Sequence, residues 1–190
     1  MPRNVRQRAF GRVAAADVRS VRRTAPPEPM IHELARRALD VFRVDLATVP
    51  STTLRSADAI DSYETPIPYD AVLDEPTDAY LERYTFWGQT FLDAASWRHY
   101  LPRWIDYAVR HASDRTTMVV DGLLASLRPP DREPPRLASL TLEQEAVVVA
   151  FLHHAASGSD AAYDPVLARQ VLEEWWMPNA WYRPAPGTGA

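Results

Sequence analysis

The chain has 190 residues, of which 46% are hydrophobic and 24% are charged. A chain of this length and composition can bury a core without covalent staples, so we expect one folded domain and exclude a wholly disordered chain. The absence of cysteine excludes disulfides and thiolate chemistry.

Neither a membrane span nor an export signal is predicted. The longest apolar run, Ala146 to Leu152, is far shorter than the about 20 residues that a spanning helix needs. The arginine-rich N-terminus is not followed by the apolar region of a signal peptide. We therefore expect a cytoplasmic protein that does not associate with membranes.

Charge divides the chain into a basic tail and an acidic body. Residues 1–29 carry seven arginines and two carboxylates, whereas the remaining chain carries 14 arginines and 23 carboxylates. The tail ends in a proline-rich stretch and is expected to be disordered; a basic amphipathic helix, or a true translation start at Met30, are the alternatives. Because the acidic body repels nucleic acid, contact with nucleic acid is expected only through this tail.

The folded part is expected to span residues 30–182, followed by a disordered tail at residues 183–190. Apolar residues recur at helical spacing from Ile31 to Leu46 and Pro50 follows them, which predicts an opening helix. Residues 56–82 hold eight carboxylates and no basic residue, which predicts a long acidic loop with one short helix near residues 77–83. That loop offers an acidic surface to a basic partner. Residues 84–91 fit either a minor β element or a helix.

The aromatic-rich segment that follows is predicted to be a helix. Asp93 can cap it and it should run to about His111, with Pro102 inside removing one hydrogen bond and bending it. Five residues fall on one face of this helix: Trp97, Tyr100, Leu101, Trp104 and Ala108.

Three more helices are predicted in the C-terminal half, over residues 118–127, over 141–156 and from Pro165 onward. Thr141 and Gln144 match a capping box, and Asp164 before Pro165 is a favoured helix start. The sequence therefore predicts a mainly α protein with about five helices in a single compact domain.

Three segments read together resemble a known family. They are the helix from Ile31 to Phe42, the block from Phe91 to Pro102, and the segment from Leu140 to Leu152. Their order and spacing are similar to those of the bacterial domain-of-unknown-function family 6714, in which a tyrosine-leucine-proline helix precedes a leucine-threonine-x-glutamate-glutamine helix. The resemblance covers about residues 30–176. It implies no activity, so no functional residue is carried over.

No catalytic or metal motif is found in the sequence. Histidines four residues apart and the His-Glu-x-x-His pattern are both absent, so we expect no metal site and no cofactor. Phosphate-binding glycine loops and the Gly-x-Ser-x-Gly motif are also absent. His99 stands beside Arg98 and Arg103, which is more typical of a surface position than of a catalytic base. His153 and His154 are expected to interact with a helix dipole.

Most aromatic residues are expected in the core, with Trp87, Trp176, Trp181 and Tyr182 the candidates for exposure. Aromatic and arginine side chains dominate many binding interfaces. The candidate binding residues are Trp87, Arg98, His99, Arg103, His111 and Trp176.

The leading functional hypothesis is a non-catalytic helical module that binds a protein partner, of the adaptor or toxin-neutralising type. The alternative is a small enzyme, or an enzyme accessory subunit, with a divergent site on the helix bent at Pro102. In that case His99, Arg103 and His111 would carry the site, since a bend there can open a cleft.

Overall fold

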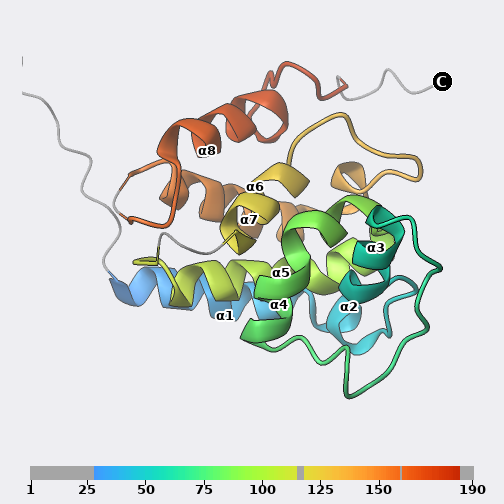
Figure 1. Cartoon of the computed structure of the whole chain (residues 1–190). Coiled ribbons are helices and arrows are strands. Elements are labelled where there is room, and N and C mark those ends of the chain that lie inside the picture. The colour runs from blue at the N-terminus through green and yellow to red at the C-terminus, as the bar shows by residue number, and fades with distance from the viewer. Residues whose placement is uncertain (1–27, 115–117, 159, 185–190) are drawn as a thin grey trace, which may run out of the picture.

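The computed structural model describes residues 28–114, 118–158 and 160–184, and most of both predicted tails lies outside them. The described residues contain eight α-helices and no strand, packed in one compact arrangement (Figure 1). The mainly α prediction is therefore confirmed, with more helices than the five expected. No helix in this part of the chain is long and apolar enough to cross a membrane. The helices are α1 (Glu28–Val41), α2 (Arg43–Ala47), α3 (Leu54–Asp61), α4 (Asp78–Gly88), α5 (Ala94–Arg110), α6 (Val119–Ser126), α7 (Leu142–Ala155) and α8 (Pro165–Val171).

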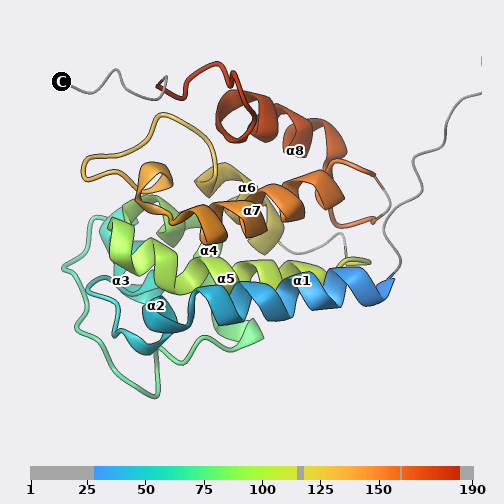
Figure 2. The same ribbon diagram turned by 180° about the vertical axis from the view of Figure 1, so that it is seen from behind.

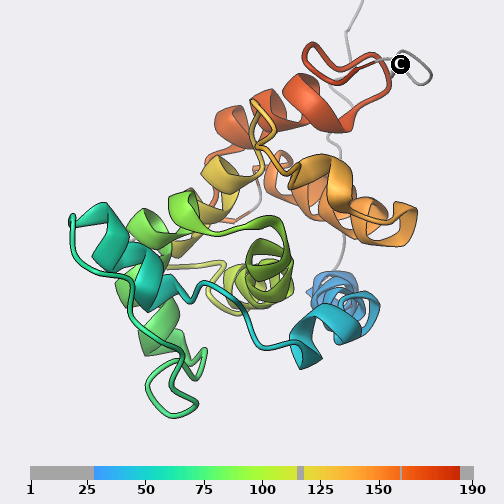
Figure 3. The same cartoon turned by 90° about the vertical axis from the view of Figure 1, so that its right-hand side faces the viewer.

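Helix α5 is the central element, because α1, α2 and α6 all pack against it. Figure 2 shows α1 lying alongside α5, and Figure 3 shows both nearly end-on. The helix begins where it was predicted, since the Asp93 side chain accepts hydrogen bonds from the backbone N–H groups of Ala95 and Ser96. It continues through the buried Pro102 to Arg110.

The predicted aromatic face of α5 forms the middle of the core. Trp97, Tyr100 and Trp104 are each 1% exposed or less. The Trp104 indole Nε1 donates to Thr85 Oγ1 at 2.9 Å, which satisfies its polar atom and ties α5 to α4.

Two segments that were assigned to loop or left ambiguous are helical. Helix α3 begins after Thr53, whose hydroxyl accepts from the Ser56 backbone N–H at 3.0 Å. This helix was not predicted, because residues 56–82 were expected to form a long acidic loop. Helix α4 begins after Thr77, which caps it through the Tyr80 N–H, so its early turns match the predicted short helix. Residues 84–91 lie in α4 and in the 3-10 turn η1 (Gln89–Phe91), so the strand alternative is wrong.

Gly88 shows how closely α3 and α4 pack. A Cβ atom at this position would lie 2.6 Å from the Leu54 carbonyl oxygen, a backbone atom that no side-chain rotation can move. A residue without Cβ is therefore required where the two helices meet.

The opening helix is broken rather than continuous. Phe42 leaves helical geometry (φ −99°, ψ 13°) with its side chain fully buried, and α2 follows at once. The break carries α2 across α5, where Arg98 donates to Asp45 at 2.9 Å. The prediction of one helix from Ile31 to Leu46 is therefore wrong, because this long-range contact overrides a continuous periodicity.

The C-terminal half follows its predicted caps. Thr141 and Gln144 form both halves of the capping box that starts α7, and Asp164 caps α8 before Pro165. Between α6 and α7 lies the short turn η2 (Leu137–Ser139).

Helix α8 continues as a π-helical turn, η3 (Leu172–Trp176). Its wider turn leaves three consecutive residues buried: Glu174, Trp175 and Trp176. Trp176 was a candidate for exposure, but it is 3% exposed and donates from Nε1 to the Leu127 carbonyl at 2.9 Å. That expectation is wrong because α-helical spacing does not apply through this turn.

Candidate functional site

One carboxylate holds the loop between α6 and α7 in place. Asp131 Oδ1 accepts from the backbone N–H groups of Arg132, Arg136 and Leu137 at 2.7–2.9 Å. Its Oδ2 accepts from the Ala138 N–H at 2.8 Å. Both oxygens of the Asp131 carboxylate thus accept hydrogen bonds from backbone N–H groups, which fixes the loop. Within the described residues, Asp131 forms no ion pair with the side chains of Arg132 and Arg136.

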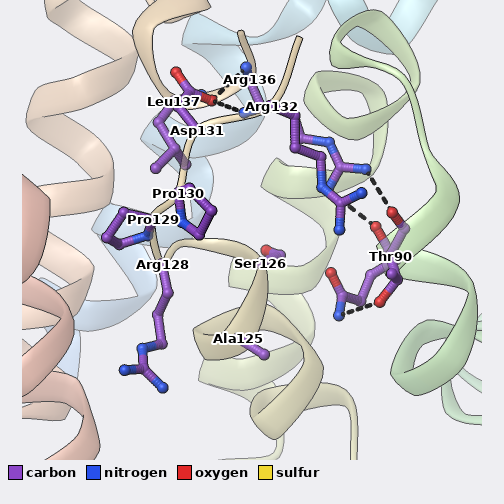
Figure 4. A pocket seen from close by; sticks show the side chains of 11 residues that line it. Thr90, Ala125, Ser126, Arg128, Pro129, Pro130, Asp131, Arg132, Arg136 and Leu137 are labelled. Atoms are coloured by element: carbon purple, nitrogen blue, oxygen red, sulfur yellow. Dashed lines mark hydrogen bonds between the residues drawn. The ribbon is translucent and has the colours of Figure 1, made fainter. Parts of the chain in front are cut away.

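This loop, the end of α6 and the turn η1 enclose a polar cavity of about 440 Å³ (Figure 4). We call it the arginine pocket. It is lined by Gln89, Thr90, Ala125, Ser126, Arg128, Pro129, Pro130, Asp131, Arg132, Arg136 and Leu137.

Arg136 is a buried cation whose hydrogen bonds within the described residues all go to backbone carbonyls. It donates to the carbonyls of Gln89 and Thr90, each at 3.1 Å, and to that of Leu92. These groups end α4 and η1, where a cation complements the helix dipole. Its Nε is buried and has no hydrogen-bond partner in the part of the chain that the structure describes. Burial, followed by the like charge of Arg132, lowers the pKa of Arg136 to about 10.

Arg128, in contrast, is paired. It contacts the buried carboxylate of Glu174 at 2.6 and 2.8 Å through two nitrogens, which ties the loop to η3. This bidentate contact holds the pKa of Glu174 below its ordinary value.

A second cavity, of about 610 Å³, adjoins the arginine pocket and shares residues 128–131 with it. We call it the proline groove. It is lined by Arg128, Pro129, Pro130, Asp131, Glu174, Trp175, Tyr182 and Pro184.

The outer wall of the proline groove is held by the residues after η3. The backbone N–H groups of Trp181 and Tyr182 donate to the carbonyls of Glu173 and Glu174, each at 3.0 Å. Arg183 adds an ion pair with Glu145 on α7. The wall is therefore a folded part of the protein, and it carries two aromatic side chains that are each more than 60% exposed.

Two of the candidate residues share a third cavity, of about 270 Å³, between α5, the residues after α2 and the acidic loop. We call it the histidine cleft. His99 is only 8% exposed and its Nδ1 lies 3.1 Å from the Asp45 carbonyl oxygen, so the expected surface position is wrong. Burial lowers the pKa of His99. Helix α2 covers it, which follows from the unpredicted break at Phe42.

Arg103 is half-buried and lines the same cleft, and its Nε has no hydrogen-bond partner among the described residues. Burial lowers the pKa of Arg103. The nearby Asp74 is engaged elsewhere, because both of its oxygens accept from Arg55, at 3.0 and 2.8 Å.

The remaining candidates lie apart from one another. Arg98 pairs with Asp45, and His111 Nε2 lies 3.0 Å from Asp78. Trp87 is 55% exposed and its ring packs edge-on against Phe86. With Trp176 buried, the predicted set does not form one site, although His99 and Arg103 share the histidine cleft.

Asp78 provides a test of pH dependence. Hydrogen bonds from Arg110, and then from His111, lower the pKa of Asp78 from 3.8 to about 2. Because this pKa is depressed in the folded protein, the interaction stabilises the fold at a pH above the ordinary pKa of 3.8. The stabilisation is lost as the pH falls toward 2. We expect Asp78→Asn to remove part of the loss of stability between about pH 4 and pH 2, measured by urea unfolding across that range.

Asp121→Asn is the control, since burial raises rather than lowers the pKa of Asp121. This variant should show the same acid-induced loss of stability as the wild type. Identical pH profiles for the wild type and Asp78→Asn would refute the role given to Asp78.

The arginine pocket and the proline groove were not predicted from the sequence. A signal was available: Arg128, Arg132 and Arg136 recur every four residues through a proline-rich stretch. Such spacing in a loop has no fixed geometry, so it could not show that the side chains line one cavity. Among the described residues, no group of three or more His, Asp or Glu side chains is placed to hold a metal ion.

A family model described as "Family of unknown function (DUF6714)" matches residues 30–180. The chain therefore belongs to this family, as its three resembling segments indicated. No curated protein and no solved structure matches the chain.

Proposed function

We propose that this member of the DUF6714 family is a non-catalytic binding module that docks a segment of a partner protein in the proline groove. Five of the eight residues lining the groove are proline, tryptophan or tyrosine. Tyrosine, tryptophan and arginine are the residue types that contribute most to binding at protein interfaces. The partner segment is expected to insert an aromatic or aliphatic side chain between Tyr182 and Pro130.

The charged groups of the groove support binding rather than catalysis. Arg128 and Glu174 are closed into a bidentate pair, and Asp131 is bonded to backbone N–H groups. A general acid or base must be able to reach the proton that it transfers. These groups are committed to holding the groove together.

The observation that carries the proposal is the fixed position of Tyr182. Its backbone N–H is bonded to the Glu174 carbonyl, while its side chain is 62% exposed and lines the groove. An aromatic side chain on a backbone that is already held in place can bind a partner with less loss of conformational entropy than one on a free chain.

The test is selection of peptides from a random display library on the full-length protein, followed by affinity measurement on two matched variants. Tyr182→Ala removes a side chain that lines the groove. Trp181→Ala removes its neighbour, which is similarly exposed at 63% and lines neither the groove nor the arginine pocket.

We expect selected peptides to share an aromatic or aliphatic position and to lose about tenfold or more in affinity on Tyr182→Ala, as is typical of a dominant interface residue. Trp181→Ala should change affinity much less. Failure to select any peptide, or equal losses in the two variants, would count against the proposal.

A second candidate function is a small enzyme or accessory subunit with its site in the histidine cleft. The observation that favours it is Arg103, whose guanidinium lines the cleft without a hydrogen bond to the described part of the chain. Ligands from a metabolite library that raise the melting temperature of the wild type, but not of Arg103→Gln, would support it. A library in which every hit stabilises both proteins equally would exclude it.

A further inference from the structure

The arginine pocket is lined by three arginines and by one carboxylate, that of Asp131. Asp131 is bonded to backbone N–H groups, and Arg128 is paired with Glu174. Neither Arg132 nor Arg136 forms an ion pair within the described residues. Figure 4 shows both side chains extending from the loop toward the wall that carries Thr90.

Two nearby positive charges repel each other, and the repulsion is strongest where water is excluded. Arg136 is 3% exposed, and no described residue forms a hydrogen bond with its Nε. A buried cation is ordinarily matched by an anion that compensates its lost hydration. Within the described chain, Arg136 donates hydrogen bonds only to carbonyl oxygens, and the carboxylates of Asp93 and Asp131 attract its charge without a direct ion pair.

The opposite wall of the pocket offers a hydroxyl donor. Thr90 Oγ1 accepts from the Gln89 side-chain amide at 3.1 Å, which leaves the hydroxyl proton of Thr90 for another acceptor. An anion in this cavity would thus meet guanidinium groups on one side and a hydroxyl group on the other.

We propose that the arginine pocket is an oxyanion-binding site, in which Arg132 contacts the ligand directly and Arg136 supplies a fixed positive charge behind it. The ligand chemistry is a phosphate, a sulfate or a carboxylate, since these groups accept the paired N–H donors of a guanidinium. The site is independent of the peptide that we propose for the adjoining groove, although an anionic group on such a peptide could reach it across residues 128–131.

The test uses the full-length protein and three probes: inorganic phosphate, sulfate and acetate, each titrated at constant ionic strength set with sodium chloride. The arginine side-chain Nε–H signals are followed by NMR. We expect the Arg132 and Arg136 signals to shift with saturation for at least one probe. Preference for phosphate and sulfate over acetate would indicate a tetrahedral ligand, and the reverse would indicate a carboxylate.

Two variants separate specific binding from general salt effects. Arg132→Gln should lower the probe affinity, measured from the Arg136 signal, about tenfold or more, because the guanidinium group that contacts the ligand is lost. Arg37→Gln removes an exposed arginine on α1, distant from the pocket in the chain, and should leave the affinity unchanged.

Shifts of the Arg136 signal that rise linearly with probe concentration, without saturation, would overturn the proposal. Equal shifts of this signal in Arg132→Gln and in the wild type would do the same. Both variants replace exposed side chains, so unfolding does not confuse the result. The Arg136 signal itself reports whether the pocket keeps its structure in Arg132→Gln.

Discussion

Replacing Trp104 by alanine is expected to lower the free energy of unfolding by about 3–5 kcal/mol, the range for deleting a large aromatic side chain from a core. Trp104 is fully buried on α5 and donates from Nε1 to Thr85 on α4. The alanine leaves a cavity and also leaves the buried Thr85 hydroxyl without its partner. Urea unfolding followed by circular dichroism measures the difference.

Trp87→Ala is the matched control, because Trp87 lies on the neighbouring helix α4 but is 55% exposed. Its loss should cost less than about 1 kcal/mol. Trp104→Phe should fall between the two, since it keeps most of the packing and removes the hydrogen bond. Equal effects of Trp104→Ala and Trp87→Ala would contradict the arrangement of the core.

Arg136→Met is expected to lower the free energy of unfolding by about 2–3 kcal/mol, because it leaves the carbonyls at the end of α4 and η1 without their donor. Methionine keeps the length and apolar stem of the side chain, so the lost interactions are mainly polar. Removal of a poorly hydrated charge offsets part of the cost, which is why the expected loss is smaller than that of Trp104→Ala.

Arg132→Met is the control, because Arg132 is exposed and its side chain has no ion pair in the described part of the chain. It should change stability by no more than about 0.5 kcal/mol. A comparable loss in the two variants would show that the loop does not depend on the carbonyl contacts of Arg136.

Helices whose first turn is capped by a neighbouring side chain could be predicted from the sequence. Asp93 caps α5, Thr141 and Gln144 cap α7, and Asp164 caps α8. In each case the capping side chain bonds to a backbone N–H within three residues, so no distant contact is needed to position it.

Features set by distant contacts could not be predicted. The break at Phe42 depends on the pairing of Asp45 with Arg98, 53 residues along the chain. That break also buries His99, which its neighbours in sequence suggested was exposed. The turn η3 buries Trp176 through a spacing that helical periodicity does not contain.

The same distinction applies to the candidate site. Arg128 pairs with Glu174, which is 46 residues away, and Arg136 bonds to carbonyls 44–47 residues away. The sequence shows the arginines but not which of them is already paired. Only the folded loop shows that Arg132 faces a cavity and pairs with no carboxylate of the described residues.

The proposed binding surface is tested most directly by mapping where a selected peptide binds on the full-length protein by NMR. We expect the Trp175 indole signal and the Tyr182 amide signal to shift together on peptide addition, because both residues line the proline groove. The signals of Trp87 and of the acidic loop at residues 62–77 should stay in place. Shifts confined to Trp87 or to that loop, with Trp175 and Tyr182 unchanged, would contradict the proposed binding surface.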